Sequence, residues 1–267
     1  MGADIKQLRT RIKSVDSTLH LTKAMGLVAS SKIRRATDSM NKGREYAEAL
    51  EETIAVLSNF EECKRTPYMA KREGSRMCLI VVAGDRGLAG GYNANIFRLL
   101  REYPDAKIIP IGKRACERFG APIRYAEDYS YEDALATAHD ICREFVEGEM
   151  DKFGIVCTKY HSMMSQEAYV KWLLPLVQSS MGRPNDAIFE PDGLTVLNAV
   201  IPEYIAGMIV SCVKESFASE VAARRVAMDN AGKNAQEMID SLGLEYNRAR
   251  QGAITQEITE IVAGSGI

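Results

Sequence analysis

The chain has 267 residues and a mass of 29.5 kDa, enough for one large domain or two of ordinary size without disulfide or metal staples. With 46% hydrophobic and 26% charged residues it is too apolar for a disordered chain, and its net charge of -2 gives no overall attraction to nucleic acid or anionic lipid. No stretch approaches the roughly 18 consecutive apolar residues that span a bilayer, and the N-terminus lacks the apolar core of a signal peptide. We expect a soluble protein that is not exported.

The first part of the chain predicts one long helix. Pro67 is the first proline, and Gly26 and Gly43 are the only glycines between Ala3 and Pro67, so little interrupts a helix there. Apolar or small residues recur in alternating steps of three and four, the pattern of a coiled-coil seam. The positions of this first seam are Ile5, Leu8, Ile12, Val15, Leu19, Thr22, Gly26, Ala29, Ile33, Ala36, Met40, Gly43, Ala47, Leu50, Ile54 and Leu57. We expect residues 1–66 to form a coiled-coil helix.

The last part of the chain, beyond Pro202, again reads as helix. Beyond Ala249 its apolar residues shift to Ile254, Ile258 and Ile261, which predicts a stutter or a change of packing partner near the end. Both helices join the intervening chain at their inner ends, so we expect residues 1–66 and 203–267 to pair as one antiparallel coil. The positions of this second seam are Val210, Lys214, Phe217, Val221, Arg224, Met228, Ala231, Ala235, Met238, Leu242, Glu245 and Ala249.

Between the two helical segments the pattern changes to alternating strands and helices. Residues 67–202 therefore predict a small Rossmann-like α/β domain. The fold class is α/β, with a long antiparallel coiled coil of the terminal helices attached to that domain. Strands are expected at 77–83, 107–111 and 155–160, with 166–174 as a hairpin partner of the last, and helices at 95–103, 114–119 and 131–147.

A glycine-rich loop, residues 84–93 with the sequence GDRGLAGGYN, follows the first predicted strand directly. Its glycine order is not G-x-G-x-x-G, and no Gly-Lys-Ser or Gly-Lys-Thr follows to hold a phosphate or magnesium. A structural turn or docking loop is thus favoured over nucleotide binding. The glycines allow a sharp turn that presents Arg86, whose planar guanidinium can pair with a carboxylate of a partner.

Charge on the first helix leaves three interpretations open. Ten basic residues precede Glu45, against three acidic ones. The solvated flank of a coiled coil is the usual explanation of such charge, but binding of an acidic protein surface, or of nucleic acid or lipid, fits as well.

Neither a metal centre nor an active site emerges from the sequence. The six cysteines are widely spaced without a C-x-x-C pair, which favours buried reduced thiols in a reducing compartment over a disulfide framework. His20, His139 and His161 lie in three separate segments, and no G-x-S-x-G or H-E-x-x-H motif occurs.

Three groups of motifs together resemble the gamma subunit family of F-type ATP synthases. The resemblance covers essentially the whole chain, is dense at both ends, and is thin from about residue 125 to 202. The motifs are IKSV at 12–15, LTKAM at 21–25 and VASSK at 28–32; DRGL at 85–88 through Asn93; and ASE at 218–220, ARR at 223–225, AMDNA at 227–231, YNRARQ at 246–251 and ITQEI at 254–258.

The resemblance implies a non-catalytic, cofactor-free rotor shaft of a bacterial F-type ATP synthase. In the family, the coil inserts into a hexamer of alternating alpha and beta subunits, and the α/β domain binds epsilon and the membrane c-ring. Ion flow turns ring and shaft, and the asymmetric shaft changes the nucleotide affinity of each beta site in turn. The absence of a transit peptide favours the cytoplasmic face of a bacterial membrane.

The resemblance also implies four contacts with partner subunits. Arg86, and Arg250 with Gln251, resemble the family's polar contacts to acidic loops of beta, and Met25 lies on a neighbouring part of the shaft. Ala89 departs from the family, which commonly has cysteine there. The chain also lacks the cysteine-bearing insertion of the chloroplast form, which makes thiol regulation of that type doubtful.

On physical grounds alone two other classes of protein compare with a rotor. A coiled-coil nucleic-acid binder or scaffold predicts affinity that falls steeply with salt. A nucleotide-dependent enzyme predicts saturable nucleotide binding by the lone chain. The near-zero net charge counts against the first and the missing phosphate-loop chemistry against the second, so the terminal motifs select the rotor.

Overall fold

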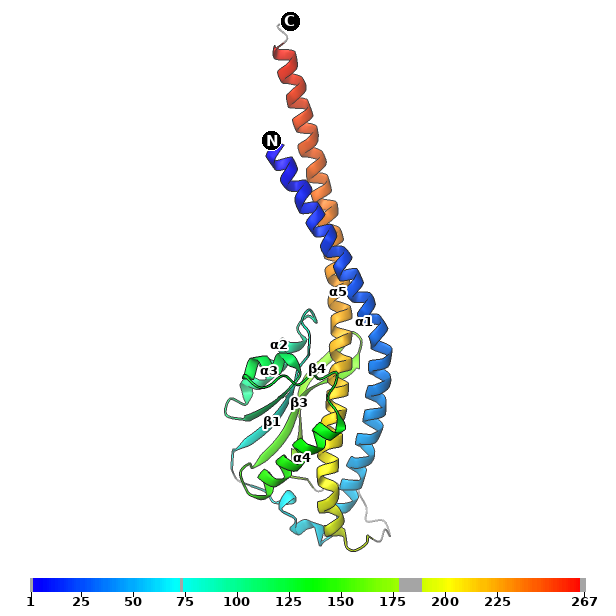
Figure 1. The fold of residues 1–267 in the computed structure, drawn as a ribbon, viewed down its shortest axis with the longest axis vertical. Helices are drawn as coiled ribbons and strands as arrows, with labels where there is room; N and C mark the ends of the chain where they lie inside the picture. The colour runs from blue at the N-terminus through cyan, green and yellow to red at the C-terminus, as the bar shows by residue number, and fades with distance from the viewer. Residues whose placement is uncertain (1, 73, 178–188, 265–267) are drawn as a thin grey trace. The chain divides into compact units, whose positions relative to one another are not determined.

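A computed structural model describes residues 2–72, 74–177 and 189–264 (Figure 1). Helix α1 (Gly2–Leu57) opens the chain and helix α5 (Gly193–Gly264) closes it, with strands and shorter helices between them. Contacts divide the chain into two compact units. We call Ser31–Ala223 the sheet unit, and Met1–Ser30 with Arg224–Ile267 the coil unit. Each long helix therefore contributes one segment to each unit, and the expected domain division after residues 66 and 202 stays a prediction.

The sheet unit contains a mixed four-stranded sheet. In the order β2-β1-β3-β4, β1 (Met77–Val82) pairs in parallel with β2 (Lys107–Ile111) and with β3 (Lys152–Ser162). Strand β4 (Ser165–Leu174) runs antiparallel to β3, as expected of a hairpin partner. Five of the six β1 residues are buried, because apolar side chains cover both faces of the sheet. The predicted α/β class is confirmed.

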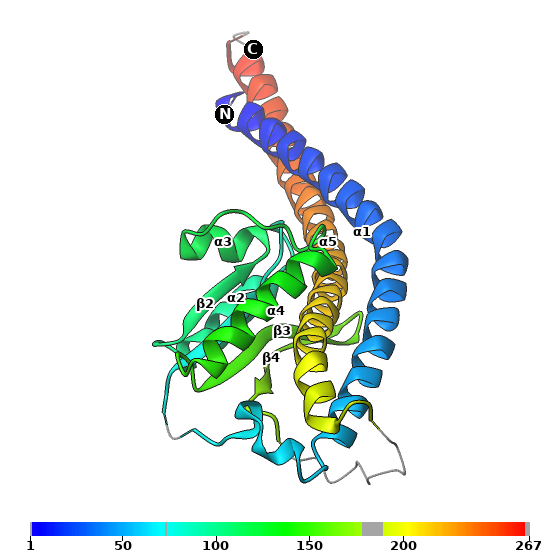
Figure 2. The same cartoon turned by 60° about the horizontal axis from the view of Figure 1, so that its bottom comes forward.

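Successive side chains of β1 point to opposite faces of the sheet, so the apolar core is divided into two clusters, one on each face. Cys78, Ile80 and Val82 face a large apolar cluster that includes α4 (Tyr131–Val146) and the inner segments of α1 and α5. Leu79 and Val81 face a smaller cluster. That cluster is completed by residues of α2 (Tyr92–Leu99), which continues as a 3-10 turn η3 (Leu100–Glu102), and of α3 (Lys113–Phe119). Figure 2 shows the helices on the two sides of the sheet.

Helix α4 is the most completely predicted of the short helices. Ser130 and Asp133 form a reciprocal capping box at its start, in which the Ser130 hydroxyl accepts from the Asp133 amide at 3.0 Å. The Ser130 hydrogen bonds hold the pKa of the Asp133 carboxyl below its usual value. The four residues predicted to share its apolar face are all buried: Ala134, Ala138, Ile141 and Phe145.

The first seam is confirmed along α1, but the helix ends before residue 66. All sixteen seam positions are buried or half-buried. The helix stops at Leu57, and the chain continues through two 3-10 turns, η1 (Cys63–Arg65) and η2 (Pro67–Met69). Cys63 and Tyr68, from these turns, join the core below the sheet, which favours a compact path over further helix.

Helix α5 begins ten residues before the expected start at residue 203 and contains Pro202. Asp192 caps it by accepting from the Thr195 amide at 2.8 Å, and Glu62 accepts from the Gly193 amide at 2.7 Å. The Thr195 hydrogen bonds keep the pKa of Asp192 below its usual value. Pro202 lacks the amide that would complete its turn, but the core around it outweighs that loss. The described helix ends at Gly264; residues 265–267, also expected to be helical, lie outside the described residues.

In the coil unit the two helices run antiparallel, as predicted. A Cβ placed on Gly26 would lie 3.6 Å from the Met228 Cβ, and one on Gly232 would lie 3.6 Å from the Thr22 hydroxyl. Each step of four residues along α1 thus matches a step of four back along α5. Continued at this register, residue 4 falls about opposite Arg250. The last turns of α5 therefore extend past the described part of α1.

The phase of the second seam is wrong at two positions in the coil unit. Met238 is 44% exposed and Glu245 is exposed. Ile239 and Tyr246, one position later in each case, are half-buried instead. Met238 and Ile239 are both apolar, so a seam with alternating steps of three and four can pass through either residue. In the structure the half-buried residue is Ile239.

Helix α5 is also the one described helix long and apolar enough by composition to cross a membrane. Within its most apolar 18-residue window, 56% is buried inside the protein. Leu197, Ile201, Ile205 and Ile209 are fully buried in the sheet unit. Such burial is typical of the core helix of a soluble protein.

Candidate partner-binding site

The glycine loop is held in shape by the buried side chain of Asp85. Its carboxylate accepts hydrogen bonds from the backbone amides of Lys113 at 3.0 Å, Ala126 at 2.9 Å and Glu127 at 2.9 Å. Lys113 is the first residue of α3, so the positive end of that helix faces a carboxylate of the protein itself. This arrangement favours the structural or docking interpretation of the loop over nucleotide binding.

A second set of contacts ties the same loop to α5. The Gly84 amide donates to the Asn93 side-chain oxygen at 2.9 Å, and the Arg86 amide donates to the Glu220 carboxylate at 3.3 Å. A Cβ at Gly84 would come within 2.8 Å of the Glu220 carboxyl group, so a larger residue there would displace the Glu220 side chain. Glu220 is 2% exposed, whereas Arg86 is exposed. The backbone of Arg86 is therefore anchored while its side chain points to solvent.

The four predicted contact residues divide between the two units. Arg86 belongs to the sheet unit, and Met25, Arg250 and Gln251 belong to the coil unit. Arg250 and Gln251 are exposed and Met25 is half-buried. Gly26, the next residue, faces Met228 and Asp229, so about 20 residues, or roughly 30 Å of helix, separate Met25 from the level of Arg250. The structure brings only Arg250 and Gln251 together, as sequence neighbours.

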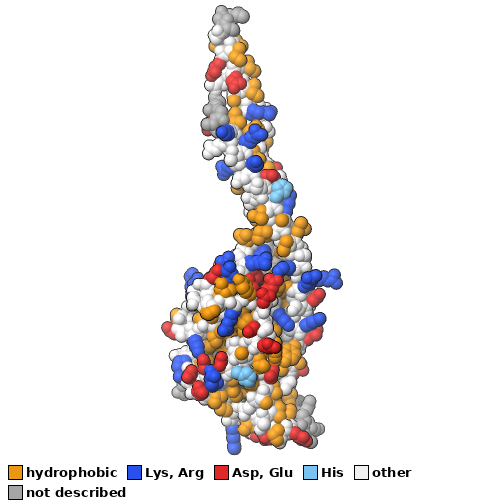
Figure 3. Space-filling view, in the orientation of Figure 1, with side chains coloured by type: hydrophobic (Ala, Val, Ile, Leu, Met, Phe, Trp, Pro, Cys, Tyr) orange, Lys and Arg blue, Asp and Glu red, His pale blue; other side chains and the backbone are white. Residues whose placement is uncertain are grey.

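Apolar side chains that the coil does not bury lie on its surface (Figure 3). On α1, Leu21, Leu27 and Val28 are more than half exposed. On the last turns of α5, Ile254 is 47% exposed and Ile261 is 71% exposed. Ile258 and Val262 share this surface with more than half of each side chain exposed. The shift predicted beyond Ala249 is thus a face of α5 without a facing α1 segment, which we call the apolar tip: Ile254, Ile258, Ile261 and Val262.

The basic residues of α1 mostly face solvent. Eight of the ten are exposed, and Lys32 and Arg44 are half-buried. Lys32 pairs with Glu127 at 2.5 Å. The charges therefore flank the coil, as the solvated-flank interpretation expects.

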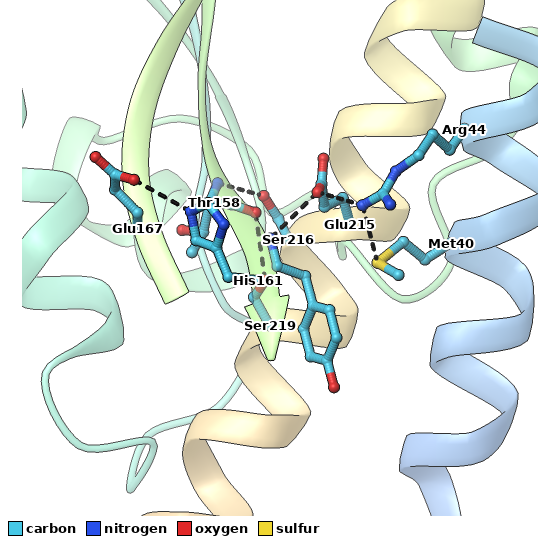
Figure 4. Close-up of polar contacts among 9 residues, drawn as sticks. Met40, Arg44, Thr158, His161, Glu167, Glu215, Ser216 and Ser219 are labelled. Carbon is cyan, nitrogen blue, oxygen red and sulfur yellow. Dashed lines mark hydrogen bonds and ion pairs between the residues drawn. The ribbon is translucent and has the colours of Figure 1, made fainter. Parts of the chain in front are cut away.

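Sequence reasoning missed a group of polar residues on α5 that contacts β3. Glu215, Ser216, Ser219 and Glu220 lie within two turns, and all but Glu215 are buried. Their side chains bond to backbone groups of β3 and of the glycine loop (Figure 4). A signal was available, because these polar residues interrupt an otherwise apolar stretch of helix. The second seam passed over them because it assumed that α5 has one buried face.

The buried thiols behave as small apolar side chains. All six cysteines are buried and unpaired. Burial raises the pKa of the Cys78 and Cys142 thiols to about 11, so both stay protonated at neutral pH. In the part of the chain that the structure describes, no group of three or more His, Cys, Asp or Glu side chains could hold a metal ion.

Comparison with known proteins agrees with the resemblance carried by the motifs. A family model described as ATP synthase matches residues 4–266. The ATP synthase gamma chain of Ruminococcus albus is 40% identical to this chain, with 98% of each covered. The corresponding protein of Moorella thermoacetica is 37% identical, again with 98% of each covered.

Solved structures agree with the fold. A chain in the cryo-EM structure of the Euglena gracilis mitochondrial ATP synthase OSCP/F1/c-ring has a TM-score of 0.67 at 21% identity, covering all of this chain and 97% of that one. A chain of the Tetrahymena thermophila central stalk and c-ring has a TM-score of 0.62 at 20% identity, covering 79% of this chain. Two long terminal helices around a small mixed sheet, with relatives at 34–40% identity over nearly the full length, lead to one conclusion. The chain belongs to the ATP synthase gamma chain family.

Proposed function

We propose that this chain is the central-stalk rotor of an F-type ATP synthase, and that it couples transmembrane ion flow to ATP synthesis or hydrolysis. It has no active site of its own in this role. Catalysis takes place in beta subunits, which the chain drives by rotating inside a hexamer of alternating alpha and beta subunits. Because the chain is asymmetric, each beta site meets a different surface of it at each angle and so adopts a different nucleotide affinity.

The observation that carries this proposal is the apolar tip. Apolar side chains exposed together on a coil mark a surface that another protein covers. Each square ångström removed from water contributes about 25 cal/mol, so several covered isoleucines add a few kcal/mol to assembly. A closed ring of subunits can surround both flanks of such a coil, whereas a single partner helix covers only one.

The exposed cationic and polar side chains supply a second kind of contact. Arg86, Arg250 and Gln251 are free to reach acidic loops of beta, and a guanidinium binds a carboxylate through two parallel hydrogen bonds. Met25 would pack against the ring beside them. These contacts change as the rotor turns, which makes them suited to coupling rather than to permanent attachment.

The sheet unit would connect the rotor to its other partners. We infer that it binds the epsilon subunit and the c-ring, so the chain associates with the membrane only through the complex. The relatives from Ruminococcus albus and Moorella thermoacetica are bacterial, which supports a place on the cytoplasmic face of a bacterial cell membrane. Inverted membrane vesicles test this: a protease added outside them should reach the chain, and protection of the chain there would contradict the assignment.

The first test of the proposal is reconstitution. Matching alpha and beta subunits should form a complex with one copy of this chain per hexamer and hydrolyse ATP with sustained turnover, while the chain alone hydrolyses none. Ile258→Asp together with Ile261→Asp should weaken assembly, because both charges enter a surface that must lose water. Gln256→Glu with Thr259→Asp, which adds the same charge on the same turns but away from the apolar tip, is a matched control. ATP hydrolysis by the lone chain would overturn the proposal. A hexamer that does not bind the chain would overturn it as well.

The contact residues have a separate test in the assembled complex. Arg86→Ala and Arg250→Ala should each lower ATP-driven ion pumping severalfold while leaving the fold intact. Arg101→Ala and Lys233→Ala remove exposed cations from the same two units and should leave pumping unchanged. Pumping by the Arg86 and Arg250 variants at the level of these controls would remove both residues from the coupling contacts.

A further inference from the structure

Beyond Val156, the edge of β3 that faces β1 has no neighbouring strand in the described sheet. The pairing of β3 with β1 ends at Val156, whereas its pairing with β4 continues to Ser162 on the other side. Beyond Val156, every second residue of β3 directs its backbone amide and carbonyl away from β4. These groups need other partners, because a buried unpaired amide or carbonyl is unfavourable. Thr158, which lies in this stretch, is 3% exposed.

Side chains of α5 occupy this edge in place of a strand. The Thr158 amide donates to the Ser216 hydroxyl at 3.0 Å, and the Ser219 hydroxyl donates to the Thr158 carbonyl at 3.3 Å. Two residues further on, the Tyr160 amide donates to the Glu215 carboxylate at 3.1 Å. Figure 4 shows these side chains reaching from the helix to the strand. We call Glu215, Ser216 and Ser219, with the β3 groups they contact, the edge joint.

Two other elements attach to the same turns of α5. The Tyr92 hydroxyl, at the start of α2, donates to the Ser216 carbonyl at 3.0 Å. Burial raises the pKa of Tyr92, so its hydroxyl keeps the proton that it donates. Glu220 accepts from the Arg86 amide at 3.3 Å, which ties in the glycine loop. Strand β3, helix α2 and the glycine loop thus all bond to residues 215–220.

Helix α1 reaches the edge joint through a different and weaker contact. Arg44 donates to the Glu215 carboxylate at 2.9 Å, but the Arg44 side chain is 42% exposed. Ala36 and Met40 of α1 also pack against Ala218 of α5 in an apolar cluster. Exposed ion pairs contribute little, because water screens them and the side chains lose freedom.

We propose that the edge joint is the torque-transmitting connection of the molecule, and that Ser216 and Ser219 are the positioning residues that stop α5 from turning or sliding against the sheet. Hydrogen bonds are directional. Three of them to a strand edge therefore fix the rotation of the helix about its own axis and its position along that axis. Apolar burial is not directional, so by itself it fixes this rotation and this position less strictly. The inference rests on the proposed rotor function, since only a rotor needs a connection that resists twisting.

The test uses the complex assembled with Ser216→Ala and Ser219→Ala together. We expect ATP hydrolysis within about twofold of wild type but severalfold fewer ions pumped per ATP, because α5 can slip against the sheet. Val213→Ala changes a buried apolar neighbour on α5 and is the matched control. It loosens the packing without removing a hydrogen bond, so the number of ions pumped per ATP should stay unchanged. The inference would be overturned if the double variant pumped as many ions per ATP as wild type, or if the control lost as many as the double variant.

Glu215 provides an independent test if the serine variant does not fold. Glu215→Gln keeps an oxygen for the Tyr160 amide and should pump normally, whereas Glu215→Ala should lose coupling. Arg44→Ala breaks only the α1 contact and should pump as wild type does. Equal coupling in the Gln and Ala variants would contradict the edge joint. Failure of the wild-type chain to assemble or pump would instead contradict the proposed function.

Discussion

The same helix, α5, meets two different environments in the two units. In the sheet unit it is surrounded by the sheet, α4 and α1, and Ile201, Ile205 and Ile209 are fully buried. In the coil unit only α1 packs against it, and burial narrows to one face that includes Ala235 and Leu242. The sheet unit therefore stabilises its part of α5 by itself, whereas the coil unit leaves apolar surface for a partner to cover.

The largest effect should come from a backbone position in the sheet unit. Gly112 follows β2 with φ +91°, and a Cβ there would lie 1.9 Å from the Ala83 carbonyl oxygen. Gly112→Ala adds dihedral strain of about 1–3 kcal/mol to that clash, so we expect a severe loss of stability. Thermal unfolding by circular dichroism measures it. Gly120, also left-handed but with open space around its Cβ, gives the control: Gly120→Ala should lower stability much less.

An effect of intermediate size is expected when a buried side chain is shortened to alanine, and we compare one such variant in each unit. Ile205→Ala leaves a cavity in a fully enclosed site and should destabilise by about 2–5 kcal/mol. Leu242→Ala should cost about 1–2 kcal/mol, since neighbours pack on one side only. Urea unfolding of both variants, followed by circular dichroism, checks the difference. Equal losses would mean that the coil unit is packed as a closed core.

The smallest effect should be a gain. Within the described residues, a Cβ on Gly243 would meet nothing within 4 Å, so Gly243→Ala replaces a flexible residue in a helix without a clash. Its helix propensity predicts a gain of about 1 kcal/mol. At Gly43 the new Cβ would lie 3.1 Å from the Lys214 side chain, so Gly43→Ala should gain less. The melting temperatures of the two variants rank them, and the reverse order would contradict the openness of the coil unit.

The elements set by local pattern were predictable from the sequence. The first seam lies on the buried face of α1 throughout, because one regular partner holds it in phase. Strand β2 has the predicted bounds, and β1 ends one residue early. That the glycine loop is no phosphate loop stays a prediction, which rests on residue types that match no phosphate-binding motif.

The errors arose where tertiary contacts outweigh local pattern. The sequence predicts a helix boundary at Pro202, but the carboxylates of Asp192 and Glu62 accept hydrogen bonds from the first turn of the helix upstream of it. The second seam chose Met238 and Glu245 over Ile239 and Tyr246, although Tyr246 is the better apolar residue. The polar residues of α5 signal a buried polar contact, but its partner on β3 could not be predicted, because that partner depends on where β1 stops beside β3. No sequence pattern records that length difference.

The carboxylate of Asp85 has a consequence for how the rotor would respond to its surroundings. It fills the space after β1 permanently, since a side chain neither dissociates nor competes with solutes. The three backbone hydrogen bonds to Asp85 hold the glycine loop without a bound solute, so its shape need not depend on the ATP concentration. Nucleotides bound elsewhere in a complex would then influence this loop through the subunits that contact it. A part that is insensitive to concentration and responsive to force is what a mechanical transmission requires.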